Sequence, residues 1–196
     1  MERNTIVVGL VALLLGLGAG YLVWSTSVPA EDGFGHRMSD GSMMDQDIDR
    51  HFIVQMIPHH EGAIAMAKIA LERSKRPEIL SLANGIIEAQ EKENGDMRAW
   101  YRSWFGTTPP EGGMGMMHMG GMEGDTNALQ NVSEADFDRE FIEQMIPHHE
   151  MAIMMAEMLR ASTVRDEMKE LANNIITSQS REIEMMRGWL TSWYGQ

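Results

Sequence analysis

The sequence predicts an all-α protein, an antiparallel four-helix bundle made of two repeated helical hairpins and preceded by an N-terminal transmembrane helix. Three observations carry this prediction. The second half of the chain repeats the first at one constant offset, which aligns Met56 with Met145 and needs no gap. Apolar residues in each half recur at steps of three and four, the spacing of an amphipathic helix. An apolar run of membrane-spanning length stands near the N-terminus.

The N-terminal run extends from Thr5 to Trp24, after a short cytoplasmic stub at residues 1–4. About twenty apolar residues span a hydrocarbon core of about 30 Å, so we predict an uncleaved anchor in the cell membrane at residues 5–24. The small residues Val28-Pro29-Ala30 offer a signal peptidase site, which makes a cleaved export signal the alternative. In both cases the rest of the chain lies outside the cytoplasm, either as the C-terminal domain of a single-pass protein or as a secreted or periplasmic protein.

The remainder divides into a linker and one duplicated domain. Residues 25–46 are rich in Gly, Asp and Ser, a composition that cannot bury a core and predicts a flexible linker. Residues 47–196 form the duplicated helical-hairpin domain. Its first half is 47–106, a loop rich in methionine and glycine follows at 107–133, and the second half is 134–195.

Each half is predicted to form two helices. In the first half the two apolar stripes are separated by a break at residues 73–77, where Pro77 suits the first turn of a new helix. Gly106 ends the second helix. The two stripes are Ile48, Phe52, Ile53, Met56, His60, Ala63, Ala67, Ala70 and Leu71, and then Ile79, Leu82, Ala83, Ile86, Gln90, Glu93, Met97, Trp100 and Trp104. Four such helices, joined in pairs by short turns, predict an antiparallel bundle with pseudo-twofold symmetry.

Composition excludes several classes of function. A net charge of −13 over 196 residues argues against nucleic acid and anionic lipid surfaces as partners. The chain has no cysteine, so it has neither disulfides nor thiolate metal sites. A soft metal would therefore be held by methionine and histidine. The 20 methionines exceed the usual share severalfold, although methionine on an apolar helix face commonly fills gaps in a core.

One hexapeptide occurs twice, as Met56-Ile57-Pro58-His59-His60-Glu61 and as Met145-Ile146-Pro147-His148-His149-Glu150. With Met56 at the centre of the inward face, His60 lies at about +40° and His59 at about −60°, so both rings straddle that face. Glu61 lies at about +140° and is predicted to face solvent. Each proline either kinks its helix or marks the start of the helix proper.

The partners of these histidines are predicted from the second helix of each hairpin. Gln90 and Glu93 lie on its apolar stripe, and folding the hairpin about its turn brings them opposite His59 and His60. The predicted metal ligands of the bundle are Met56, His59, His60, Glu93, Met145, His148, His149 and Glu182. The carboxylates are either direct ligands or groups that orient the rings. The alternative is that these histidines bind no metal and are core residues hydrogen-bonded to Glu93 and Glu182.

These donors favour copper. Imidazole suits copper, zinc, iron and nickel, whereas thioether selects Cu(I) and, by the same softness, silver. Histidine with glutamate favours Cu(II). The sequence leaves open whether the two halves share one ion or bind one each.

The loop between the halves carries a second group of soft donors. Its glycine-spaced methionines form neither a helical stripe nor a strand alternation, so they predict capture of Cu(I) or Ag(I), with a plain linker as the alternative. These predicted ligands are Met114, Met116, Met117, His118, Met119 and Met122. In the third helix, Met151, Met154 and Met158 are predicted to point outward, as a surface copper site, a face for the loop or a dimer contact.

The repeated Met-Ile-x-His-His, followed by Ala-Ile-x-Met-Ala and later by Gln-x-x-Glu and Met-x-x-Trp, resembles the domain-of-unknown-function 305 family over roughly residues 47–195. This resemblance implies a ferritin-like four-helix bundle. Some exported members of the family are linked to copper binding and copper tolerance. The resemblance therefore implies copper association for Met56, His59, His60, Met145, His148 and His149.

No catalytic residue is predicted. Di-iron chemistry in such a bundle expects Glu-x-x-His pairs, and no histidine of the chain lies three residues after a glutamate. We therefore predict an exported, membrane-anchored protein that binds copper for sequestration, transfer or tolerance, with a homodimer or a copper-delivery protein as possible partners. A copper redox enzyme, either a cupric reductase or a Cu(I) oxidase, is the first alternative. A structural helical domain without metal is the second.

Overall fold

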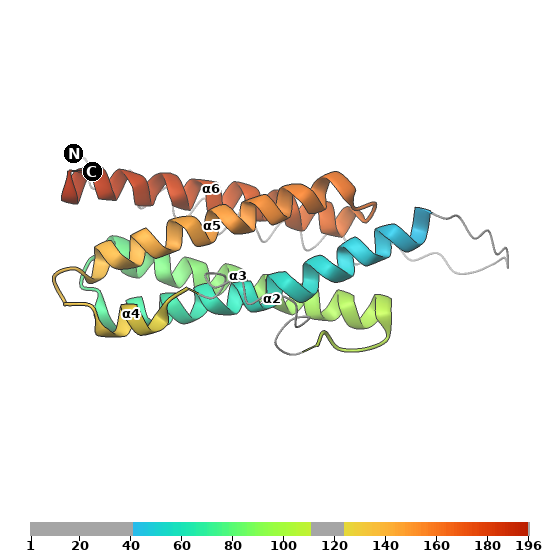
Figure 1. The fold of residues 1–196 in the computed structure, drawn as a ribbon, viewed down its shortest axis with the longest axis horizontal. Helices are drawn as coiled ribbons and strands as arrows, with labels where there is room; N and C mark the ends of the chain where they lie inside the picture. Colours follow the sequence, from blue (N-terminus) through green and yellow to red (C-terminus); the bar gives the residue numbers. More distant parts are fainter. Residues whose placement is uncertain (1–40, 111–123, 196) are drawn as a thin grey trace, which may run out of the picture. The chain divides into compact units, whose positions relative to one another are not determined.

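The computed structural model describes residues 41–110 and 124–195, which belong to one unit, Ser39–Gln196. This part of the chain contains helices and no strand, which confirms the all-α prediction (Figure 1). The helices are α2 (Gly41–Arg73), α3 (Pro77–Phe105), α4 (Thr126–Asn131), α5 (Phe137–Ser162) and α6 (Asp166–Tyr194). None of the helices described is long and apolar enough to cross a membrane. The predicted anchor at residues 5–24 lies outside the described residues.

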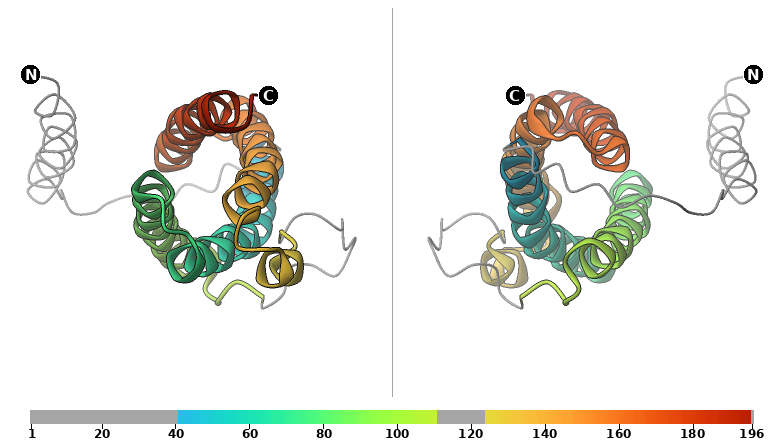
Figure 2. Two further views of the ribbon diagram at one scale, coloured as in Figure 1. Left: turned by 90° about the vertical axis from the view of Figure 1, so that its left-hand side faces the viewer. Right: turned by 90° about the vertical axis from the view of Figure 1, so that its right-hand side faces the viewer.

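The four long helices form two hairpins. α2 packs against α3 and α5 packs against α6, while α2 and α5 join the two hairpins (Figure 2). The α2–α3 turn and the α5–α6 turn lie at opposite ends of the bundle (Figure 1). Pro77 takes the first turn of α3, and Gly106 closes that helix in the left-handed conformation with a φ of 70°. The predicted pair of helical hairpins is present.

The start of α2 and the presence of α4 differ from the sequence prediction, and the alternative that the sequence left open at the two prolines is decided. α2 begins at Gly41, inside the linker predicted at residues 25–46, because local glycine and serine content does not report the packing of the helix that follows. Pro58 and Pro147 lie inside α2 and α5, so neither proline starts its helix. The short helix α4 lies within the predicted loop at 107–133, where Asp125 caps it by accepting a hydrogen bond from the Ala128 amide.

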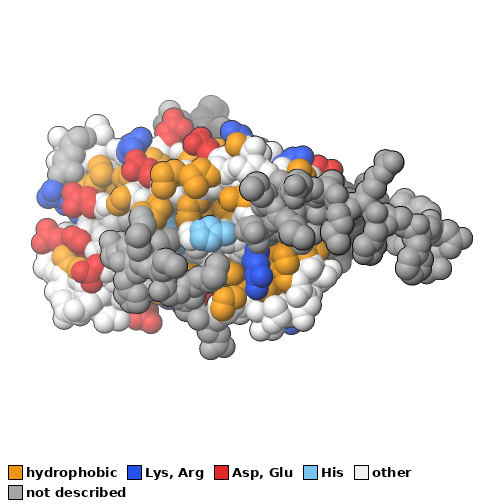
Figure 3. Space-filling view, turned by 45° about the vertical axis from the view of Figure 1, so that its right-hand side comes forward, with side chains coloured by type: hydrophobic (Ala, Val, Ile, Leu, Met, Phe, Trp, Pro, Cys, Tyr) orange, Lys and Arg blue, Asp and Glu red, His pale blue; other side chains and the backbone are white. Residues whose placement is uncertain are grey.

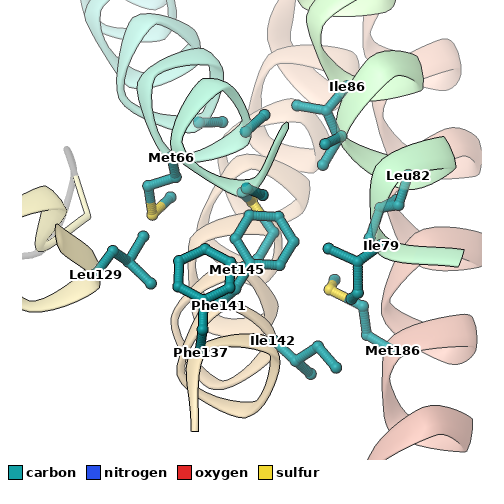
Figure 4. Packing of buried hydrophobic residues seen from close by; sticks show 14 of the residues in the cluster. Met66, Ile79, Leu82, Ile86, Leu129, Phe137, Phe141, Ile142, Met145 and Met186 are labelled. Carbon is teal, nitrogen blue, oxygen red and sulfur yellow. The ribbon is translucent and has the colours of Figure 1, made fainter. Parts of the chain in front are cut away.

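The core contains two hydrophobic clusters. The first includes Leu129 of α4, Phe137 and Phe141 of α5, Ile79 of α3 and Met186 of α6 (Figure 4). The second cluster is Phe52, Ile53, Val54, Met56, Ile57, Met97, Tyr101, Ala152, Ala156, Leu159, Met168, Leu171, Ala172 and Ile175. On α2 the second cluster ends at residue 57 and the first starts at residue 63. A polar layer therefore separates the two clusters.

Reciprocal ion pairs join the hairpins at both ends. Arg165, in the α5–α6 turn, lies 3.0 Å from the buried carboxylate of Asp49 on α2 and 4.1 Å above the ring of Trp104. Arg76, in the α2–α3 turn, lies 3.1 Å from Asp138 and 4.2 Å above the ring of Trp193. The two sets of residues are equivalent in the repeat. Each turn thus binds the opposite hairpin, as the predicted pseudo-twofold symmetry requires.

Candidate metal centre

Four histidines occupy the polar layer between the two hydrophobic clusters. His59 and His60 lie in the middle of α2, and His148 and His149 lie in the middle of α5. Their exposed fractions are between 0% and 3%. The helical phase predicted from the sequence, with both histidines of each hexapeptide turned inward, is confirmed.

The carboxylates predicted to face the histidines do so. Nε2 of His60 lies 2.8 Å from Oε2 of Glu93 on α3, and Nε2 of His149 lies 2.6 Å from Oε2 of Glu182 on α6. Since a carboxylate accepts, each Nε2 donates its hydrogen. The Nδ1 atoms of both rings then carry the free lone pair.

The glutamate of each hexapeptide faces solvent instead. Glu61 pairs with Arg98 at 2.6 Å and its side chain is 55% exposed. Glu150 pairs with Arg187 at 2.5 Å in the same manner. These glutamates therefore take no part in the centre, as predicted.

The rings of His59 and His148 are in direct contact across the two halves of the molecule. Their centroids are 3.8 Å apart and their planes are tilted by 43°. Within each pair the rings lie farther apart, at 6.4 Å for His59 and His60 and at 6.3 Å for His148 and His149. Among these ring pairs, the two hexapeptides therefore contact each other through His59 and His148.

The surroundings keep His59 uncharged. Burial lowers the pKa of His59 from 6.5 to about 2, because an imidazolium would lose its hydration there. Positive charge on His148, His60 and His149 would lower this pKa further, and a hydrogen bond with the backbone of His148 opposes the shift. A neutral imidazole keeps a lone pair, which is the form that binds metals.

Several buried nitrogens lack a protein partner. Nδ1 of His60 and Nδ1 of His149 make no hydrogen bond within the described part of the chain. An unsatisfied buried polar atom costs about 1–3 kcal/mol. A metal ion or a buried water would satisfy these atoms. Neutral imidazole nitrogens of this kind fit a borderline ion such as copper.

The structure does not place all the predicted donors around one point. Among the described residues, no group of three or more His, Asp and Glu side chains lies close enough to hold a metal ion. Met56 is fully buried in the second hydrophobic cluster, and Met145 is fully buried beside Phe141 in the first (Figure 4). Their role as ligands stays a prediction.

The predicted loop ligands Met114, Met116, Met117, His118, Met119 and Met122 lie outside the described residues. On α5, Met154 and Met158 are 52% and 57% exposed, in agreement with the outward direction predicted for them.

Two residues of interest were not singled out from the sequence. Asn94 is buried with its Oδ1 atom unpaired. Because Asn94 follows Gln90 by four residues, the sequence could have placed both residues on the same face of the helix. Met155 is half-buried on α5, and its repeat equivalence to the buried Met66 was the signal there.

A family described as "Domain of unknown function (DUF305)" matches residues 49–196. The chain belongs to the DUF305 family. This finding confirms the resemblance carried by the two hexapeptides.

Solved structures of CopM are similar to this DUF305 chain. "CopM in the Cu(II)-bound form" is 48% identical, with a TM-score of 0.69, and the match covers 74% of this chain and 97% of that chain. "CopM in the Cu(I)-bound form" is 45% identical, with a TM-score of 0.66, over 74% and 97% of the two chains. "CopM in the Ag-bound form (by soaking)" is 44% identical, with a TM-score of 0.66, over 74% and 96%.

A curated relative matches over a shorter stretch. The protein named Uncharacterized protein L153, from Acanthamoeba polyphaga mimivirus, is 42% identical over 51 residues, which are 26% of this chain and 34% of that protein. The match therefore spans about a third of that relative.

Proposed function

We propose that this DUF305 protein binds copper as a cargo between its two helical hairpins. The observation that carries the proposal is the contact between the rings of His59 and His148, whose centroids lie 3.8 Å apart, beside the unpaired Nδ1 atoms of His60 and His149. The similarity to CopM, whose solved structures include Cu(II)-, Cu(I)- and Ag-bound forms, supports copper and silver as the ions.

Each group has a separate role in this proposal. The imidazoles of His59 and His148 supply nitrogen donors at the junction of the hairpins. Glu93 and Glu182 orient His60 and His149 by accepting from Nε2, which leaves the Nδ1 atoms to bind metal. This favours the carboxylates as orienting groups over direct ligands. Bound copper would supply the positive charge that compensates these lone pairs.

The low pKa of His59 supports binding in mildly acidic surroundings. At its usual pKa of 6.5 a histidine would be protonated there and would lose the lone pair that a metal needs. Burial keeps this ring neutral well below that pH. Copper capture by His59 would therefore persist where exposed histidines no longer bind.

The proposal includes export and anchoring. The apolar segment at 5–24 would hold the bundle at the outer side of the cell membrane, and the methionines of residues 114–122 would collect Cu(I) before it reaches the bundle. The sequence supports both steps. Protein recovered from membranes should keep its original N-terminus. A mature chain that begins at Glu31 would instead show that residues 5–24 belong to a cleaved export signal.

Copper content of protein purified from copper-supplemented cells tests the central function. The variant with His59, His60, His148 and His149 all changed to Ala should lose the copper held by the bundle. A His59→Leu/His148→Leu variant, which fills the space, guards against simple unfolding, and circular dichroism should show an unchanged helix content. His51→Ala is the matched control, because His51 is exposed on the same helix. Equal copper in the control and in both folded variants would contradict the proposal.

A further inference from the structure

α5 carries four methionines on one side, and they differ in burial. Met154 and Met158 are 52% and 57% exposed, whereas Met151 and Met155 are half-buried. They are spaced by three and four residues, so the Cβ atoms of neighbouring members lie about 5–6 Å apart. Long methionine side chains at this spacing bring their sulfur atoms within reach of one ion. Exposed apolar side chains that are neighbours on one helix commonly mark a binding surface.

These methionines lead toward the buried histidine pair. Met151 and Met155 follow His148 by three and seven residues, which places both within about 60° of the direction of His148 around the helix. His148 is 3% exposed. Soft donors on α5 therefore run from the surface, through two half-buried thioethers, to the ring that touches His59.

The other hairpin lacks this row. The residues of α2 that correspond to Met151, Met154 and Met158 are Gly62, Ala65 and Ile69, and only Met66, which corresponds to Met155, keeps the sulfur. Met66 is fully buried, and Gly124 approaches it so closely that a Cβ at Gly124 would lie 2.2 Å from its Sδ atom.

α4 and the residues just before it cover part of α2. α4 packs against α2 and, to a smaller extent, against α5, and Gly124 lies against Met66. Figure 3 shows one face of the molecule, on which hydrophobic side chains reach the surface between charged ones. Met66 of α2 is thus buried against Gly124, whereas its equivalent Met155 is half-buried on the same side of α5 as the exposed Met154 and Met158.

We propose that Met154, Met158, Met151 and Met155 form a thioether relay that receives Cu(I) or Ag(I) at the surface of α5 and passes it to His148 and His59. The relay rests on the proposed copper function of the histidines. The ion keeps its charge and moves by exchange of one soft donor for the next, so no oxidant or reductant is needed. Thioethers suit this task because they select Cu(I) and Ag(I) over harder ions.

Silver(I) is the probe for the test, because it matches Cu(I) in softness and does not change oxidation state. Methionine methyl groups labelled with carbon-13 and histidine rings labelled with nitrogen-15 report arrival of Ag(I) at each stage by NMR. Sub-stoichiometric Ag(I) should shift the methyl signals of Met154 and Met158 first. In rapid-mixing experiments, a Met154→Leu/Met158→Leu variant should load the histidine rings severalfold more slowly and reach the same final occupancy. Leucine keeps the volume and removes the sulfur.

Met185→Leu is the matched control, because Met185 is a half-buried methionine on α6. Loading at the same rate in the control and in the double variant would overturn the relay, even if Met154 and Met158 bind silver. Methyl signals that change with protein concentration but do not change when Ag(I) is added would also overturn the relay. They would identify this side of α5 as a contact between copies of the protein. Failure of the wild-type histidine rings to respond to Ag(I) or copper would instead refute the proposed function.

Discussion

The rings of His59 and His148 lie 3.8 Å apart, although one comes from α2 and the other from α5. They occupy equivalent positions in the two halves of the repeat. The duplication therefore provides a pair of adjacent imidazoles, which neither hairpin alone could bring together. A second histidine in each half is held by a glutamate of its own hairpin, so the centre combines contacts within and between hairpins.

Changing Glu93 and Glu182 to Gln should weaken copper binding without unfolding the bundle. The amide can rotate and offer a donor to Nε2, so His60 and His149 lose their fixed orientation and tautomer, which costs about 10–100-fold in affinity. Competition titration with a copper chelator measures the change. Glu61→Gln is the control, because Glu61 is solvent-facing and pairs with Arg98. A loss in the control as large as in the double variant would contradict the orienting role.

Stability of the metal-free protein should fall as the pH drops below 6.5. Burial holds the pKa of His59 at about 2 in the folded state, whereas the unfolded chain titrates near 6.5. Between these values the unfolded state binds the extra proton, so the free energy of unfolding decreases by about 1.4 kcal/mol per pH unit from His59.

Urea denaturation in the presence of a chelator measures this dependence. In a His59→Phe variant the free energy of unfolding should depend less on pH than in the wild type. A His51→Gln variant, changed at an exposed histidine, should show the same pH dependence as the wild type. Identical slopes for the wild type and His59→Phe would show that burial of His59 is not the cause.

The two inter-hairpin ion pairs should differ in their contribution to stability. Arg165 pairs with Asp49, whose side chain is fully buried, whereas the equivalent Arg76 pairs with Asp138, whose side chain is 16% exposed. Removing one partner of a buried pair costs about 3–5 kcal/mol, while more exposed pairs contribute about 1 kcal/mol or less. Arg165→Ala should therefore destabilise the bundle more than Arg76→Ala in urea denaturation. The reverse order would contradict this assignment.

Gly124→Ala should destabilise the packing of α4 on the bundle. Gly124 has a φ of 68°, and an added Cβ would lie 2.2 Å from Sδ of Met66. A left-handed residue with a Cβ costs about 1–2 kcal/mol before the clash is counted. Thermal unfolding measures the effect. Gly95→Ala is the control, since Gly95 lies inside α3 with nothing near its Cβ position and should gain up to about 1 kcal/mol.

The helical period explains how much of the site was predictable. Because inward and outward positions repeat every 3.6 residues, the sequence alone placed His59 and His60 inside, Glu61 outside and Glu93 opposite His60. The contact between His59 and His148 was beyond this reasoning, since it depends on how one hairpin is rotated against the other. Arg165 and Asp49 help to set that rotation, and nothing in the local sequence pairs them.

The start of α2 and the presence of α4 were missed for a different reason. Gly41 and the residues after it have the composition of a linker, and α4 is only six residues long, from Thr126 to Asn131. A helix of that length is unstable alone and forms because Leu129 is buried against the first hydrophobic cluster. Both the start of α2 and the formation of α4 depend on tertiary packing, which cannot be inferred from local helix propensity.

Anomalous diffraction at the copper absorption edge, from crystals of the copper-loaded protein, tests whether copper binds between the two hairpins. We expect a copper peak in contact with the ring nitrogens of His59 or His148 at the junction of α2 and α5. Copper peaks confined to the surface, with the rings of His59 and His148 still in contact and no copper beside them, would contradict the proposed function.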